Sequence, residues 1–168
     1  NLAVRIVAPT ETMTNNQIVV NIPNIRSPVP LFIVMRALGI ESDKKIIQYC
    51  LLDIEENEYY VDLFLPSVHD AGYIFTQESA LEYMKLLTKQ KTVNSVLNIL
   101  SNYFLPHIGE LNFIEKALFL GYMVKRLLLV FTNDERPTNR DSYEYKRIED
   151  SGMLLYQLFR EYYKLQWH

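Results

Sequence analysis

The charged residues best placed for binding chemistry gather in one short stretch near the end of the chain. Arg140, Asp141, Lys146 and Arg147 follow a run of turn-forming residues that contains Pro137. Cationic side chains on a loop can bind phosphate oxygens without reading a base sequence. Carboxylates in the same span can instead pair with these cations and fix the loop against a neighbouring domain. The residue types leave both interpretations open.

Residues suited to catalysis or metal binding are scattered along the sequence. His69, His107 and His168 lie far apart, and no second cysteine accompanies Cys50. There is no glycine-rich phosphate loop and no nucleophile elbow. We therefore expect no catalytic residue and no metal site, with Cys50 acting as a small buried hydrophobic side chain and His107 as a hydrogen-bonded structural imidazole.

An apolar segment precedes the charged loop. Within residues 117–131 only Lys125 and Arg126 are charged. One predicted helix face carries residues spaced three and four apart, namely Phe113, Ala117, Leu120, Val124, Leu127 and Phe131. Apolar residues cover most of the other faces, so we expect a central helix buried nearly all round, too short in its uncharged part to span a membrane. Gly121 inside it costs about 1 kcal/mol against alanine, which indicates close packing of a second helix.

The remaining elements predict an α+β fold that is mostly α-helical, with a small N-terminal β-hairpin. β-Branched runs at residues 2–7 and 17–22 are typical of two strands. Helices are expected from Pro30 to Gly39, at residues 43–51, through Val68, from a capping box at Thr76, at residues 93–106 and near the C-terminal end. A chain of 168 residues fits one domain with one sizeable core.

Two groups of cations outside the loop have simpler explanations than binding. Arg36 can touch a partner, but an ion pair with Asp43 or Asp53 is the favoured interpretation. Three lysines within residues 85–91 suit the C-terminal end of a helix, which is favoured over a phosphate contact.

Composition limits the class of protein. The net charge is −3 and the pI is about 5.6, so there is no general basic surface for nucleic acid and any DNA contact must be local. A single cysteine suits a reducing compartment, and no signal peptide or membrane-spanning run is visible, so an intracellular protein is expected.

Three segments together carry a family resemblance. Residues 29–43 read VPLFIVMRALGIESD, residues 104–108 read FLPHI, and residues 115–129 lead to the loop NRDSYEYKR at 139–147. In this order they resemble the second-largest subunit of multisubunit DNA-directed RNA polymerases, the counterpart of the bacterial β subunit. The loop departs from the family pattern at Asn139, Ser142 and Glu144, where relatives usually have Asp, His and Gly.

The resemblance implies a division of the chain. Residues 1–138 would form the lobe, an outer domain that faces the protrusion across the downstream DNA cleft. Residues 139–168 would be a loop and helix that return toward the protrusion, and the whole would be a fragment of a much longer chain. The channel-facing candidates are then Arg140, Asp141, Lys146 and Arg147.

The resemblance also implies activity and partners. The parent polymerase would be a nucleotidyltransferase that uses Mg²⁺ held mainly by the largest subunit, so this fragment would be non-catalytic and without a cofactor of its own. Its partners would be the largest subunit, the other polymerase subunits, DNA and transcription initiation factors, with no membrane.

One alternative belongs to another class of protein. A freestanding helical adaptor could bind a partner protein through its aromatic face, with the motif matches fortuitous.

The abundance of Asn, Ile, Lys and Tyr is typical of an AT-rich genome, and we expect a large nucleocytoplasmic DNA virus as the source. The location would then be the host cytoplasm and the virion, and otherwise the nucleus.

Overall fold

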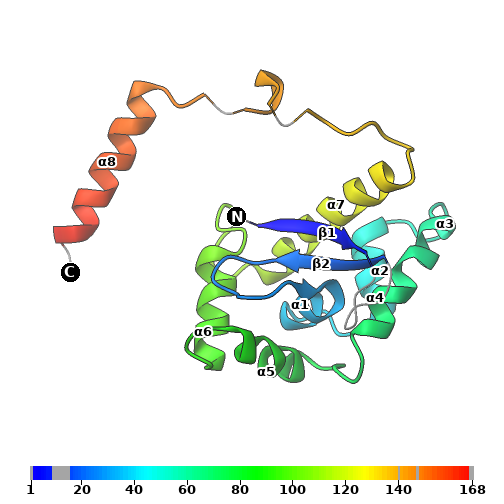
Figure 1. The fold of residues 1–168 in the computed structure, drawn as a ribbon. Coiled ribbons are helices and arrows are strands. Elements are labelled where there is room, and N and C mark those ends of the chain that lie inside the picture. Colours follow the sequence, from blue (N-terminus) through cyan, green and yellow to red (C-terminus); the bar gives the residue numbers. More distant parts are fainter. Residues whose placement is uncertain (1, 9–15, 140, 147, 167–168) are drawn as a thin grey trace. The chain divides into compact units, whose positions relative to one another are not determined.

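The computed structural model describes residues 2–8, 16–139, 141–146 and 148–166. The chain divides into two units, which Figure 1 shows as a ribbon. We call Asn1–Glu135 the body and Arg136–His168 the C-terminal unit. Each is described by itself.

The body begins with a small antiparallel sheet in the order β1-β2-β3. Its strands are β1 (Ala3–Val7), β2 (Gln17–Asn21) and β3 (Val29–Pro30). The predicted hairpin is confirmed as β1 and β2, with Ile6 opposite Ile18. The two-residue strand β3 was not predicted, because a run this short gives no alternation to detect and Pro30 lacks a backbone donor. Ile18, Val19 and Val20 are all fully buried, so β2 is covered on both faces.

Most of the body is helical, which confirms the predicted α+β class. Every residue of α1 is buried, and Figure 1 shows this helix between the sheet and α5. The helices before the central one are α1 (Leu31–Ala37), α2 (Asp43–Leu51), α3 (Glu58–Val61), α4 (Leu65–Asp70), α5 (Gln77–Leu87) and α6 (Val93–Asn98). The predicted capping box is present at the start of α5, where Thr76 and Ser79 bond each other's backbone N–H groups.

The segment after α6 is more irregular than expected. A helix to Pro106 was predicted, but α6 passes into a π-helical turn, η2 (Ile99–Tyr103), and helical structure ends there. Phe104 and Leu105 follow in extended and left-handed backbone and are buried. A π-turn adds one residue to a helical turn, which periodicity in the sequence does not reveal.

The central helix is α7 (Phe113–Phe131), and it corrects one prediction. We expected burial nearly all round, yet Leu118, Phe119 and Tyr122 are exposed by 39%, 38% and 55%. The helix packs mainly against α2 and β1, and its buried residues are Lys116, Ala117, Leu120, Gly121, Val124 and Leu128. The exposed apolar side is called the outer face of α7.

The C-terminal unit contains a short 3₁₀ turn, η3 (Tyr143–Tyr145), and the helix α8 (Ser151–Gln166). The predicted last helix is therefore confirmed. Apolar side chains such as Leu155 and Phe159 are exposed along it, by 66% and 68%. No helix among the described residues is long and apolar enough to cross a membrane.

Candidate nucleic-acid interface

Of the four residues predicted to form the interface, the structure describes two, Asp141 and Lys146. Asp141 and Lys146 form an ion pair with 3.9 Å between Oδ1 and Nζ. Their side chains are 81% and 49% exposed, so the pair lies in solvent and contributes little to stability. Arg140 and Arg147 lie outside the described residues. Contact of this loop with nucleic acid stays a prediction.

The loop is shaped by its own short-range hydrogen bonds. The Asn139 side-chain oxygen accepts the N–H of Asp141 at 3.0 Å, and the Asn139 carbonyl accepts the N–H of Ser142 at 3.1 Å. The Ser142 hydroxyl oxygen accepts the N–H of Glu144 at 3.4 Å, at the start of η3. Asn and Ser commonly form turns of this kind. The departures from the family pattern at Asn139 and Ser142 are thus compatible with a defined turn.

The Lys146 side chain of this turn remains accessible, 49% exposed. The ammonium group of Lys146 lies 5.7 Å from the centre of the Tyr143 ring, and Tyr143 itself is 84% exposed. An exposed cation beside an aromatic ring can meet a phosphate with only weak competition from Asp141. The local ion pair and a phosphate contact are therefore compatible with each other.

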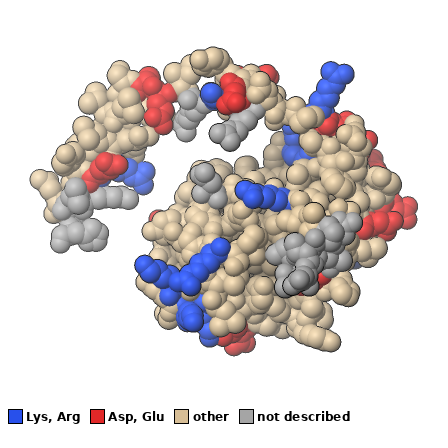
Figure 2. All heavy atoms as spheres, in the orientation of Figure 1, with Lys and Arg blue, Asp and Glu red and all other residues tan. Residues whose placement is uncertain are grey.

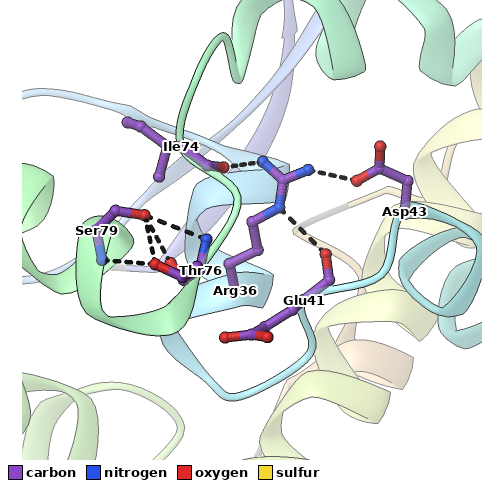
Figure 3. Close-up of polar contacts among 6 residues, drawn as sticks. All are labelled: Arg36, Glu41, Asp43, Ile74, Thr76 and Ser79. Atoms are coloured by element: carbon purple, nitrogen blue, oxygen red, sulfur yellow. Dashed lines mark hydrogen bonds and ion pairs between the residues drawn. The ribbon is translucent and has the colours of Figure 1, made fainter.

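A second polar cluster surrounds Arg36, inside the body (Figure 3). Arg36 is 1% exposed, and its guanidinium pairs with the Asp43 carboxylate. The same group donates to the carbonyl oxygens of Glu41, at 3.4 Å, and of Ile74. The ion pair expected with Asp43 is confirmed. Each nitrogen of the guanidinium donates one of these bonds, so the cluster joins α1 to α2 and to the segment after α4, as expected of a structural ion pair.

A second buried cation, Lys116, was not predicted from the sequence. Lys116 on α7 is fully buried, and its ammonium group donates to the carbonyls of Leu100 at 2.7 Å and Ser101 at 2.8 Å. A longer bond of 3.4 Å reaches the carbonyl of Glu110. Burial lowers the pKa of Lys116, and the nearby Glu110 opposes that shift. The sequence did contain a signal of this burial. Lys116 lies four residues before Leu120, and this spacing places Lys116 on the buried face of the helix.

Cys50 and His107 each make structural contacts within the described part of the chain. Cys50 is buried, and desolvation raises the pKa of its thiol to about 12, so the prediction of a small buried hydrophobic side chain is confirmed. His107 is exposed and meets the Phe119 ring edge-on at 5.2 Å. It makes this aromatic contact instead of the expected hydrogen bond with another described residue.

Metal-binding side chains do not gather anywhere in the described part of the chain. No group of three or more His, Cys, Asp or Glu residues could hold an ion there.

The class of protein follows from the fold and from comparison with known families. Residues 5–149 match the family described as RNA polymerase Rpb2, domain 2. This covers most of the chain and the whole described body except its first strand residues, so the chain belongs to that family. The adaptor alternative required the motif matches to be fortuitous, and the family match shows that they are not.

Particular relatives place the chain within the second-largest subunit. It is 38% identical over 86% of its length to the DNA-directed RNA polymerase II subunit RPB2 of Encephalitozoon cuniculi. It is 33% identical over 92% to the same subunit of Eremothecium gossypii, and 30% identical over 95% to the DNA-directed RNA polymerase subunit Rpo2 of Saccharolobus solfataricus. The chain spans 13–14% of the length of these relatives. A viral source stays a prediction.

Proposed function

We propose that this chain is the lobe of the second-largest subunit of a DNA-directed RNA polymerase. In this role it helps form the downstream DNA cleft and offers a docking surface for transcription initiation factors, without doing chemistry itself. The parent enzyme would join the largest and other subunits around DNA, use Mg²⁺ held elsewhere, and work in the host cytoplasm and virion if viral, or otherwise in the nucleus. The observation that carries the proposal is the family match over residues 5–149.

The structure offers surfaces of the kind that such a role needs. The outer face of α7 exposes Leu118, Phe119 and Tyr122 side by side along one helix. Exposed apolar patches of this type mark protein interfaces. The exposed apolar side chains of α8 are a second such surface, on the C-terminal unit. A polymerase subunit with many neighbours would cover surfaces like these.

The proposal is tested first on the native protein. The gene product that contains this sequence is tagged, purified under mild conditions and measured by intact mass. We expect a product of the size of the relatives that copurifies with a larger subunit and extends RNA on a DNA template. A native product near 19.8 kDa that copurifies with no polymerase subunit would overturn the proposal.

The predicted DNA contact of the loop is tested in the assembled enzyme. Arg140, Lys146 and Arg147 are changed to alanine together, and DNA retention is measured at several salt concentrations. If all three bind phosphate, the slope of log affinity against log salt falls by about 0.9 for each phosphate that is no longer neutralised. Lys44→Ala is the control, since Lys44 is an exposed cation on α2, away from the loop in sequence. An equal decrease in retention at every salt concentration would show that the loop has a folding role instead.

A further inference from the structure

A groove of about 460 Å³ lies on the body, away from the sites described above. Three segments line it: residues 24–26 after the sheet, residues 89–90 between α5 and α6, and residues 95–103 of α6 and η2. We call it the basic groove, because its lining includes Arg26 and Lys89 and no acidic side chain. Its size lies in the range of pockets that hold small ligands or short peptide segments.

The walls of the basic groove are tied together by hydrogen bonds. The N–H of Arg26 donates to the carbonyl of Leu87 at 3.3 Å, and Ile25 forms a β-bridge with Thr88. The Thr88 hydroxyl donates to the carbonyl of Lys85 at 2.8 Å and accepts the N–H of Lys91 at 3.1 Å. The segment with Arg26 and the segment with Lys89 are thus held next to each other, so that the groove is preformed.

The third wall depends on the buried cation Lys116. Its ammonium group holds the carbonyls of Leu100 and Ser101, which lie in the π-helical turn. A π-turn changes the direction in which the following side chains point and is frequent at functional sites. Tyr103 is the last residue of this turn, lines the groove and is 51% exposed. The buried Lys116 thereby holds η2 in place, and η2 positions the Tyr103 side chain at the groove.

The two cations of the groove have no ion-pair partner among the described residues. Elsewhere in the body Lys85 pairs with Glu82, and Arg126 pairs with Glu135 at 3.1 Å. Arg26 and Lys89 are exposed and lie within 4 Å of no described carboxylate. Figure 2 shows Lys and Arg side chains gathered at the lower left of the body, where Figure 1 places α6 and one end of α5. A chain of net charge −3 thus keeps a local positive site at this groove.

We propose that the basic groove binds an extended acidic peptide segment of a partner protein. Arg26 and Lys89 pair with two of its carboxylates, and the ring of Tyr103 packs against an apolar side chain between them. The amides of Asn24 and Gln90 bond its main chain. The inference rests on the docking role proposed above and names the surface and the chemistry for that role.

The groove fits a peptide better than a nucleic acid for two reasons. Amide side chains carry both donors and acceptors, which match the N–H and C=O groups of a peptide main chain, whereas a phosphate backbone offers only acceptors. Two cations are also few for a nucleic-acid site, because its affinity comes largely from the number of phosphates that Lys and Arg side chains neutralise.

The test uses the purified chain and fluorescence anisotropy. The probe is a fluorescein-labelled hexapeptide, Asp-Glu-Phe-Asp-Glu-Asp, and its amide analogue, Asn-Gln-Phe-Asn-Gln-Asn, is the uncharged control. We expect the acidic probe alone to bind, and the double variant Arg26→Ala with Lys89→Ala to bind about tenfold more weakly. The matched control is Lys44→Ala with Arg136→Ala, which removes the same charges from exposed positions outside the groove and should leave the affinity unchanged.

Further outcomes decide between the proposal and its rivals. Tyr103→Ala should weaken binding of the acidic probe, while Tyr103→Phe should keep it. The proposal is overturned if the acidic probe does not bind, if the control variant loses as much affinity as the groove variant, or if the uncharged peptide binds equally well. Tighter binding of a short poly-thymidine strand, abolished in the groove variant, would also overturn it in favour of nucleic acid. None of these outcomes bears on copurification with the largest subunit, so the wider polymerase role is judged separately.

Discussion

Replacing Gly121 with alanine should destabilise the body, although alanine favours a helix more than glycine does. A Cβ atom added at Gly121 would lie 2.3 Å from the carbonyl oxygen of Tyr49 and 2.8 Å from its carbonyl carbon. It would also lie 3.2 Å from the Cα of Cys50. All three atoms belong to the backbone of α2, so no side-chain rotation can relieve the contact. The two helices would have to separate along their interface.

The size of the effect follows from two opposing terms. Overpacking of a well-packed interior costs about 1–3 kcal/mol, and the upper end applies because both partners are helix backbone. The higher helix propensity of alanine offsets about 1 kcal/mol of this cost. We therefore expect a net destabilisation of about 2 kcal/mol, which for a chain of this size lowers Tm by roughly 4–8 °C. Gly121→Leu should cost more, because three further heavy atoms enter the same space.

Urea unfolding followed by far-ultraviolet circular dichroism measures this destabilisation as a lower midpoint at an unchanged slope. Gly152→Ala in α8 is the matched control, since its added Cβ would meet only the Asp150 carboxylate, at an ordinary 3.6 Å. We expect no destabilisation there. If Gly121→Ala unfolds at the same or a higher urea concentration than the parent chain, α2 and α7 do not require glycine at their contact and the reasoning fails.

Two further predictions concern buried polar groups. Lys116→Met should lower the free energy of unfolding by about 2 kcal/mol, because the carbonyls of Leu100 and Ser101 lose their donor, and an unchanged urea midpoint would contradict this. Cys50 should not react with Ellman's reagent until the chain unfolds, since its pKa of about 12 keeps the thiol protonated. A raised pKa in the folded state gives stability that is complete below the ordinary value of 9.0 and is lost as pH rises through about 12. The stability advantage of the parent over Cys50→Ala should shrink accordingly in alkaline buffer, and a constant difference would refute the assignment.

Local signals in the sequence were enough to predict much of the fold. The start of α5 was visible because Thr76 and Ser79 supply both halves of a capping box. The helix predicted at residues 43–51 is α2, with the same limits. The glycine in α7 predicted a close helix contact, and the position of Gly121 against Tyr49 supports that interpretation. Each of these signals depends on neighbours within a few residues or on one helix face.

Features that depend on what an element packs against could not be predicted in the same way. The outer face of α7 is as apolar as a buried face, so hydrophobicity alone indicated burial on all sides. The sequence does not separate a surface that the body covers from one that a partner would cover. The basic groove was missed for a similar reason, because Arg26 and Lys89 are 63 positions apart and their segments are brought together by the bridge between Ile25 and Thr88 and by the bond from Arg26 to Leu87.

The motifs that carried the family resemblance are mainly packing motifs, which explains why the family was easier to infer than the site. The segment at residues 29–43 supplies both members of the ion pair between the buried Arg36 and the partly exposed Asp43. The segment at residues 104–108 supplies the buried Phe104, and the segment from residue 115 supplies Lys116 and Gly121 at internal contacts. Such residues must fit one another, so their order along the chain specifies a fold. A binding surface needs only a few exposed side chains brought together by that fold, and their spacing in the sequence can be arbitrary. For this chain, the search for function therefore belongs on the exposed faces of the body and of α8.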